Sequence, residues 1–115
     1  DFNNQGQTGA DKANAKLKII SDLAITKVKI AALTETGYQV TASISPVANW
    51  FSTYLYSALT AKDIQISYVV FWTNHKDGYY VPTPAAANAA DFKTFVAKSK
   101  SALVNNLPKM YELPK

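Results

Sequence analysis

The chain has 115 residues, of which 48% are hydrophobic and 17% charged, the composition of an ordinary globular domain. Its formal net charge of +4 comes from twelve lysines and eight acids, without any arginine. The lysines are scattered along the chain, which favours a solvated surface over a nucleic-acid interface, because nucleic-acid binding needs basic side chains clustered on one face.

Several classes of site are excluded by residues that the sequence lacks. There is no cysteine, so no disulfide, thiolate nucleophile or Cys-ligated zinc is available, and the redox compartment stays open. No apolar run approaches the roughly 18 to 20 residues of a membrane-spanning helix, and the start lacks the pattern of a signal peptide. The chain begins without Met, so we expect that an upstream part was removed or left out. We expect neither a metal nor a cofactor.

The first predicted helix covers residues 10–25 and follows a polar loop over residues 1–9. Thr8-x-x-Asp11 resembles a capping box, which marks the start of a helix. Apolar residues then recur at steps of three and four and predict one buried face: Ala13, Leu17, Ile20 and Ala24.

A buried strand is predicted over residues 28–33, which are β-rich and nearly continuous in apolar residues. Thr34-Glu35-Thr36-Gly37 follows directly. A carboxylate therefore stands at the carboxyl end of this strand, where a glycine opens a loop.

A second helix is predicted over residues 46–61, with Ser45 as its N-cap and Pro46 at its first position. Its aromatic and aliphatic residues repeat with helical period, so we expect Trp50 and Phe51 to pack in the core. A second strand is predicted over residues 64–72.

Residues 73–78 are predicted to form a polar loop with a turn at Asp77-Gly78, and residues 79–84 continue as an extended segment. Asn88-x-x-Asp91 is a further capping pattern and predicts a helix over residues 89–105. The tail beyond residue 106 contains too many prolines to continue that helix.

The predicted order is helix, strand, helix, strand, helix, which implies α/β architecture with a right-handed parallel crossover. Two parallel strands alone leave two open edges and uncovered apolar faces. We therefore expect this segment to belong to a larger sheet.

The chemistry of the chain centres on Glu35 and Trp72, which end the two predicted strands. In α/β barrels catalytic groups lie at the carboxyl ends of the strands, so both side chains should face one crevice. A carboxylate beside an indole suits a sugar: the carboxylate attacks or stabilises the anomeric carbon, and the ring packs on the pyranose. From the residues alone, an acid that caps the strand end and a tryptophan in the core remain the alternative.

Several separated motifs resemble glycoside hydrolase family 26, whose best-known members are retaining β-1,4-mannanases. The similarity extends over roughly residues 10 to 112 and includes Asn49-Trp50-Phe51, Tyr79 to Pro84, Ala90 to Phe95 and Leu107 to Tyr111. Ala32-Leu33-Thr34-Glu35-Thr36-Gly37-Tyr38 resembles the family's strand 7, and Ser67 to Asn74 resembles strand 8.

The resemblance implies the C-terminal fragment of a (β/α)8 TIM barrel, comprising helix 6, strand 7, helix 7, strand 8 and helix 8. A whole barrel takes roughly 250 residues, so more than half would be absent. Residues 1–115 would form part of a single catalytic barrel, with no second domain.

The resemblance also implies residue roles: Glu35 as the nucleophile, Trp72 as the platform of subsite −1, and Asn74 as a weaker candidate near the glycone side. Thr73 stands where many mannanases of the family carry Arg, a departure that affects contacts at subsite −2. The family's acid/base Glu, with a His before it, lies on strand 4, which would precede residue 1.

Three further residues are candidates for substrate contact. His75 lies in the loop after the second strand, although a lone His beside Lys76 is also typical of a solvated turn. Tyr38 and Tyr80 could flank the cleft or simply close it.

The activity implied is endo-hydrolysis of mannan, galactomannan or glucomannan by double displacement, in a secreted, cell-surface or periplasmic enzyme. The partners implied are the β-mannan substrate and the remainder of the barrel, possibly as a separate chain. The isolated chain is expected to be inactive because it lacks the acid/base. The alternatives are a related barrel hydrolase acting on xylan or mixed-linkage glucan, and a non-catalytic carbohydrate-binding module.

Overall fold

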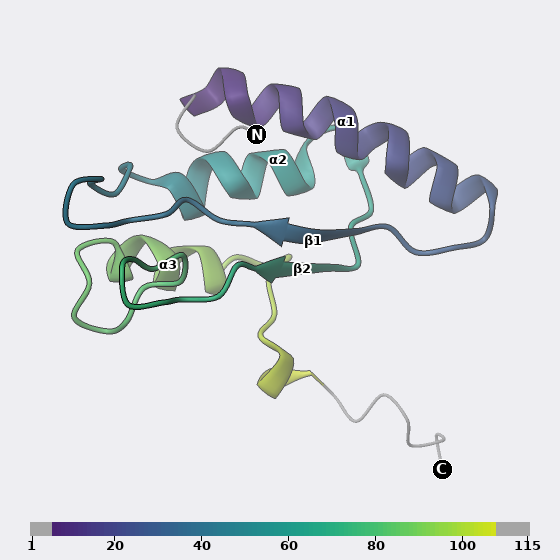
Figure 1. The fold of residues 1–115 in the computed structure, drawn as a ribbon. Coiled ribbons are helices and arrows are strands. Elements are labelled where there is room, and N and C mark those ends of the chain that lie inside the picture. The colour runs from purple at the N-terminus through teal and green to yellow at the C-terminus, as the bar shows by residue number, and fades with distance from the viewer. Residues whose placement is uncertain (1–5, 108–115) are drawn as a thin grey trace, which may run out of the picture.

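The computed structural model describes residues 6–107, and its elements follow the predicted order of helix, strand, helix, strand, helix (Figure 1). The second helix is composite, because a π-helical stretch, η1, continues directly into α2. The elements are α1 (Gly6–Thr26), β1 (Ala32–Thr36), η1 (Trp50–Leu55), α2 (Tyr56–Thr60), η2 (Ala61–Asp63), β2 (Tyr68–Phe71), α3 (Ala89–Val96) and η3 (Val104–Asn106).

The two strands pair in parallel, as predicted, and the second helix connects them in the chain. Ala32 pairs with Tyr68, and β1 and β2 run side by side in Figure 1. α1 packs against α2, and α3 packs against η1. The arrangement matches a fragment of a barrel, in which helices cover one face of a parallel sheet.

The core is built on η1, whose Trp50, Phe51 and Leu55 are 2%, 1% and 0% exposed. The Phe51 ring lies 5.8 Å from that of Phe71 on β2 and 5.0 Å from that of Phe92 on α3. Edge-to-face packing at such distances is favourable. The predicted core role of Trp50 and Phe51 is confirmed.

The start of α1 differs from the prediction, because the helix begins at Gly6 rather than near residue 10. The Thr8-x-x-Asp11 pattern therefore lies inside the helix and does not cap it. Residues 1–5 of the predicted loop lie outside the described residues.

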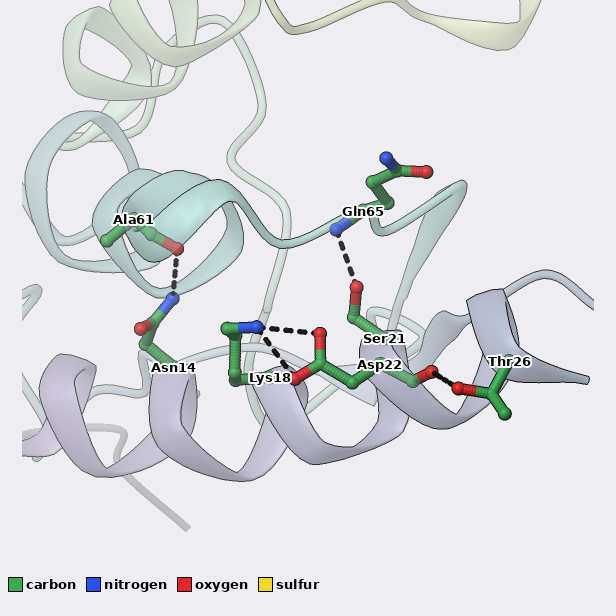
Figure 2. A network of polar contacts seen from close by, with 7 residues as sticks. All are labelled: Asn14, Lys18, Ser21, Asp22, Thr26, Ala61 and Gln65. Atoms are coloured by element: carbon green, nitrogen blue, oxygen red, sulfur yellow. Dashed lines mark hydrogen bonds and ion pairs between the residues drawn. The ribbon is translucent and has the colours of Figure 1, made fainter.

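The buried face of α1 also differs, since it includes Asn14 and Ser21, while Ile20 is 48% exposed. Asn14 donates hydrogen bonds to the carbonyls of Ala58 and Ala61 at 3.1 and 2.9 Å. Ser21 Oγ accepts the N–H of Gln65 at 2.8 Å, and Figure 2 shows this bond together with the one to Ala61. Leu17 and Ala24 are buried as predicted. Apolar periodicity alone does not find Asn14 and Ser21, because a face that binds backbone groups carries polar residues.

The first strand begins later than predicted, at Ala32, and Val28 is 90% exposed. Residues 27–29 instead terminate α1: the N–H groups of Lys27 and Lys29 bond to the carbonyls of Leu23 and Ala24. These N–H groups are thus not available to a sheet. This shift brings Glu35 inside β1.

The second helix begins at Trp50 rather than Pro46, because Asn49 adopts a left-handed conformation (φ 56). Its first N–H groups are capped by Asp91 of α3 instead of Ser45. The second strand is likewise shorter than predicted, spanning Tyr68–Phe71.

The third helix ends at Val96, so its predicted continuation to residue 105 is wrong. Its N-cap residue, Asn88, makes no capping hydrogen bond and accepts the Tyr79 hydroxyl at 3.0 Å. The predicted Asp77-Gly78 turn is confirmed by a bridge between His75 and Gly78. Most of the tail, residues 108–115, lies outside the described residues.

No helix among residues 6–107 is long and apolar enough to span a membrane.

Candidate active site

A β-bulge lies near the carboxyl end of β1, in the stretch that contains the candidate nucleophile Glu35. Leu33 pairs with Val69 and Thr36 with Phe71, so three residue steps along β1 (33 to 36) oppose two along β2 (69 to 71). One extra residue of β1 is thus left unpaired, as in bulges next to active sites.

Glu35 lies within this irregular stretch of β1. Leu33, two residues earlier, packs against the core cluster, whereas Thr34 and Glu35 are both exposed. The carboxylate is therefore free to meet a ligand rather than being buried beneath the helices.

Trp72 lies immediately after β2 and is held next to β1. Its backbone N–H donates to the carbonyl of Thr36 at 2.9 Å, and its side chain is 47% exposed. An indole that is half exposed at a strand end leaves a ring face for packing.

Glu35 and Trp72 line one open hollow of about 750 Å³. Their neighbours there include Gly37 and Tyr80, and α1 contributes Lys12 and Lys16. The prediction that both strand ends face one crevice agrees with this geometry. The basic residues of α1 at this hollow were missed, because they belong to a helix distant in sequence.

Tyr80 lies against Gly37 on the wall of this hollow. A Cβ atom at Gly37, whose φ is +140°, would approach Cδ1 of Tyr80 to 2.8 Å. Glycine at this position therefore permits both the backbone conformation and the close approach of the ring. The sequence signal for it was the glycine after the strand, which was interpreted only as the start of a loop.

Asn74 binds the polypeptide itself. Its Oδ1 accepts the N–H groups of Tyr80 and Val81 at 2.8 and 3.0 Å, and its Nδ2 donates to the carbonyl of Val81 at 2.8 Å. The amide thus joins the loop after β2 to the extended segment that follows.

His75 sits in the same loop with both ring nitrogens in contact. The N–H of Asp77 donates to Nδ1 at 3.3 Å, and the Gln39 amide lies 3.1 Å from Nε2. Its ring centre is 6.2 Å from that of Tyr80. His75 borders Tyr80 but does not line the hollow that holds Glu35.

Tyr38 turns toward the core. It packs against the core cluster, and its ring lies 6.4 Å from that of Trp50. Of the two tyrosines considered from the sequence, Tyr80 lines the hollow and Tyr38 does not.

No second carboxylate lines the hollow among residues 6–107. The Asp91 carboxylate is engaged by the N–H groups of Phe51 and Ser52, and Asp22 pairs with Lys18 at 2.6 Å. Glu35 is therefore the one acid that this part of the chain brings to the site. The same residues contain no cluster of three His, Cys, Asp or Glu that could hold a metal.

The chain is similar to several solved protein structures. No protein-family model matches the chain, and no curated protein does. GH26C from Muricauda sp. MAR_2010_75 is 49% identical with a TM-score of 0.93, over 98% of this chain and 30% of that one.

Two structures of Cellulomonas fimi mannanase are also similar. A modular endo-β-1,4-mannanase, described among glycoside hydrolase family 26 mannanases, is 28% identical with a TM-score of 0.76, over 86% of this chain and 23% of that one. An endo-β-1,4-mannanase double mutant is 26% identical with a TM-score of 0.75, over 92% of this chain and 24% of its own. The chain thus spans less than a third of each of these structures.

Proposed function

The chain is a segment of a glycoside hydrolase family 26 (β/α)8 barrel, and on this premise we propose that it carries the nucleophile of a retaining endo-β-1,4-mannanase. The observation that carries the proposal is the shared hollow of Glu35 and Trp72 at the carboxyl ends of two parallel strands. Barrel enzymes build their active sites at these strand ends.

In the proposed reaction the Glu35 carboxylate attacks the anomeric carbon and forms a glycosyl ester as the aglycone leaves. A second carboxyl group protonates the leaving oxygen and later deprotonates the water that cleaves the ester. Retaining enzymes hold the two groups about 5 to 5.5 Å apart. Among residues 6–107 only Glu35 is brought to the site, so the second group is proposed to come from the rest of the barrel.

Trp72 is proposed as the platform for the sugar ring at subsite −1. Its half-exposed indole lines the same hollow as the carboxylate, and we propose that a pyranose stacked on it presents its anomeric carbon to Glu35. Tyr80 lines the same hollow and is proposed as a second aromatic contact. His75 borders Tyr80, and we propose that it contributes to the rim. Tyr38 packs against the core cluster instead.

The substrate is proposed to be β-mannan, since the similar Cellulomonas fimi proteins are endo-β-1,4-mannanases. Related barrel hydrolases can share a nucleophile motif and differ in their subsites, so xylan and mixed-linkage glucan remain the competing substrates. By analogy with polysaccharide hydrolases, we propose a secreted or cell-surface location.

The remainder of the barrel is the proposed partner of this segment. Tyr68 and Val70 on β2 are 49% and 48% exposed, and Ile19 and Leu23 on α1 are 68% and 54% exposed. Apolar surface of this extent needs a cover, and the chain spans only 30% of the Muricauda structure. Without that cover and the second carboxyl group, the isolated chain is proposed to be inactive.

The test uses the intact barrel that contains this segment, assayed on mannan, xylan and lichenan. The proposal is supported if the intact barrel cleaves mannan and if Glu35→Ala lowers this activity by several orders of magnitude while sugar binding is retained. Cleavage of xylan or lichenan alone would sink the mannan assignment. Sugar binding without turnover in the wild type would identify a carbohydrate-binding module instead.

A further inference from the structure

The side-chain amide of Asn74 makes three hydrogen bonds to the backbone. Two N–H groups, from Tyr80 and Val81, point at Oδ1, and Nδ2 faces the carbonyl of Val81. This pattern fixes which end of the amide is oxygen, because only an oxygen can accept both N–H groups. The oxygen has no acceptor position left for a sugar hydroxyl, and one N–H of the amide remains.

The residue that Asn74 holds, Tyr80, lies on the wall of the hollow beside Glu35. Its ring rests on Gly37, two residues after Glu35, where a Cβ atom would be 2.8 Å from Cδ1. The backbone of Tyr80 is thus fixed by Asn74 and its ring by the strand end that carries the carboxylate.

A second connection holds the same segment. Tyr79 and Val40 exchange both backbone hydrogen bonds at 2.9 Å, which ties the loop after β1 to the segment containing Tyr80. Asn74 adds the tie to the loop after β2. The ring of Tyr80 is therefore positioned relative to both strand ends at once.

We propose that Asn74 is a positioning residue, which holds Tyr80 in place as an aromatic wall of the substrate site and does not itself bind sugar. The inference rests on the proposed function, because it presumes that a carbohydrate occupies the hollow. The sequence suggested that Asn74 contacts the substrate directly. The inference instead gives Asn74 an indirect role, through Tyr80.

A double-mutant cycle in the intact barrel tests this coupling. Asn74→Ala, Tyr80→Ala and the double variant are compared by kcat and KM on whichever of mannan, xylan and lichenan the wild type cleaves. We expect Asn74→Ala to lower kcat/KM about tenfold, mainly through KM, and to add less than about twofold once Tyr80 is Ala. Lys76→Ala, an exposed change in the same loop, should stay within about twofold of the wild type.

If Asn74→Ala does not fold, Asn74→Asp serves in the same cycle. Its carboxylate can still accept both N–H groups but cannot donate to the Val81 carbonyl. If the effects of the two single substitutions on kcat/KM multiply in the double variant, the inference is overturned and the proposed function stands. A wild-type barrel that cleaves none of the three polysaccharides would overturn both.

Discussion

The Asp91 carboxylate of α3 accepts the backbone N–H of Phe51 at 2.9 Å, across 40 residues of sequence. Its second oxygen accepts the N–H of Ser52 at 3.0 Å. One side chain therefore caps the first turn of a helix to which it does not belong, and it fixes α3 against that helix. An acid at a helix N-terminus is stabilised by the unpaired N–H groups and the helix dipole.

Replacing Asp91 should destabilise the fold. Asp91→Ala leaves two partly buried N–H groups without a partner, and we expect the free energy of unfolding to fall by about 1 to 3 kcal/mol. Urea denaturation of the intact barrel measures it. The matched control, Asp77→Ala, removes a carboxylate from an exposed turn and should cost about 0.5 kcal/mol or less. Equal losses in the two variants would show that the cap contributes nothing.

The polar face of α1 gives a second stability prediction (Figure 2). Asn14→Ala removes the donors to the carbonyls of Ala58 and Ala61 in a buried contact, which should cost about 1 to 3 kcal/mol. Lys18→Ala on the same helix breaks only the exposed ion pair with Asp22, which should cost about 0.5 kcal/mol or less. Chemical denaturation curves of the two variants compare them. The interpretation fails if the Lys18 variant is the less stable one.

Gly37→Ala should disturb both stability and the site. The new methyl group would meet the ring of Tyr80 in a backbone conformation that favours glycine, so we expect a loss of about 1 kcal/mol or more and a lower kcat/KM. The same change in a Tyr80→Ala background should cost less, because the contacts with Cδ1 and Cγ of the ring are removed and only the Cβ of residue 80, at 3.0 Å, remains. If Gly37→Ala costs as much there as in the wild type, the contact with Tyr80 is not what requires glycine.

The order of elements and the parallel pairing of the strands could be predicted from the sequence, because they follow from local periodicity and turn residues. The convergence of Glu35 and Trp72 followed in turn from the parallel arrangement. The position of Glu35 and Trp72 alone left their roles open. The resemblance to family 26 motifs suggested those roles.

The predictions that the structure contradicts have a common cause. In each case a group that is distant in the sequence determines the local structure. Asp91 caps the second helix from α3, and the carbonyls of Ala58 and Ala61 accept hydrogen bonds from Asn14 on a buried face. The bulge before Thr36 depends on the register between two strands. Neither helix and strand propensities nor capping patterns identify these partners, because both depend only on residues that are close in the sequence.

The central claim is that Glu35 forms a covalent bond to the sugar, and trapping that bond tests it most directly. A 2-deoxy-2-fluoro glycoside with a good leaving group slows the hydrolysis of the glycosyl-enzyme, so the intermediate accumulates for peptide mass spectrometry. The account predicts that the intact barrel carries one glycosyl group on the peptide containing Glu35, and none in Glu35→Ala. Labelling of another carboxylate, or full turnover by the Glu35→Ala variant, would contradict it.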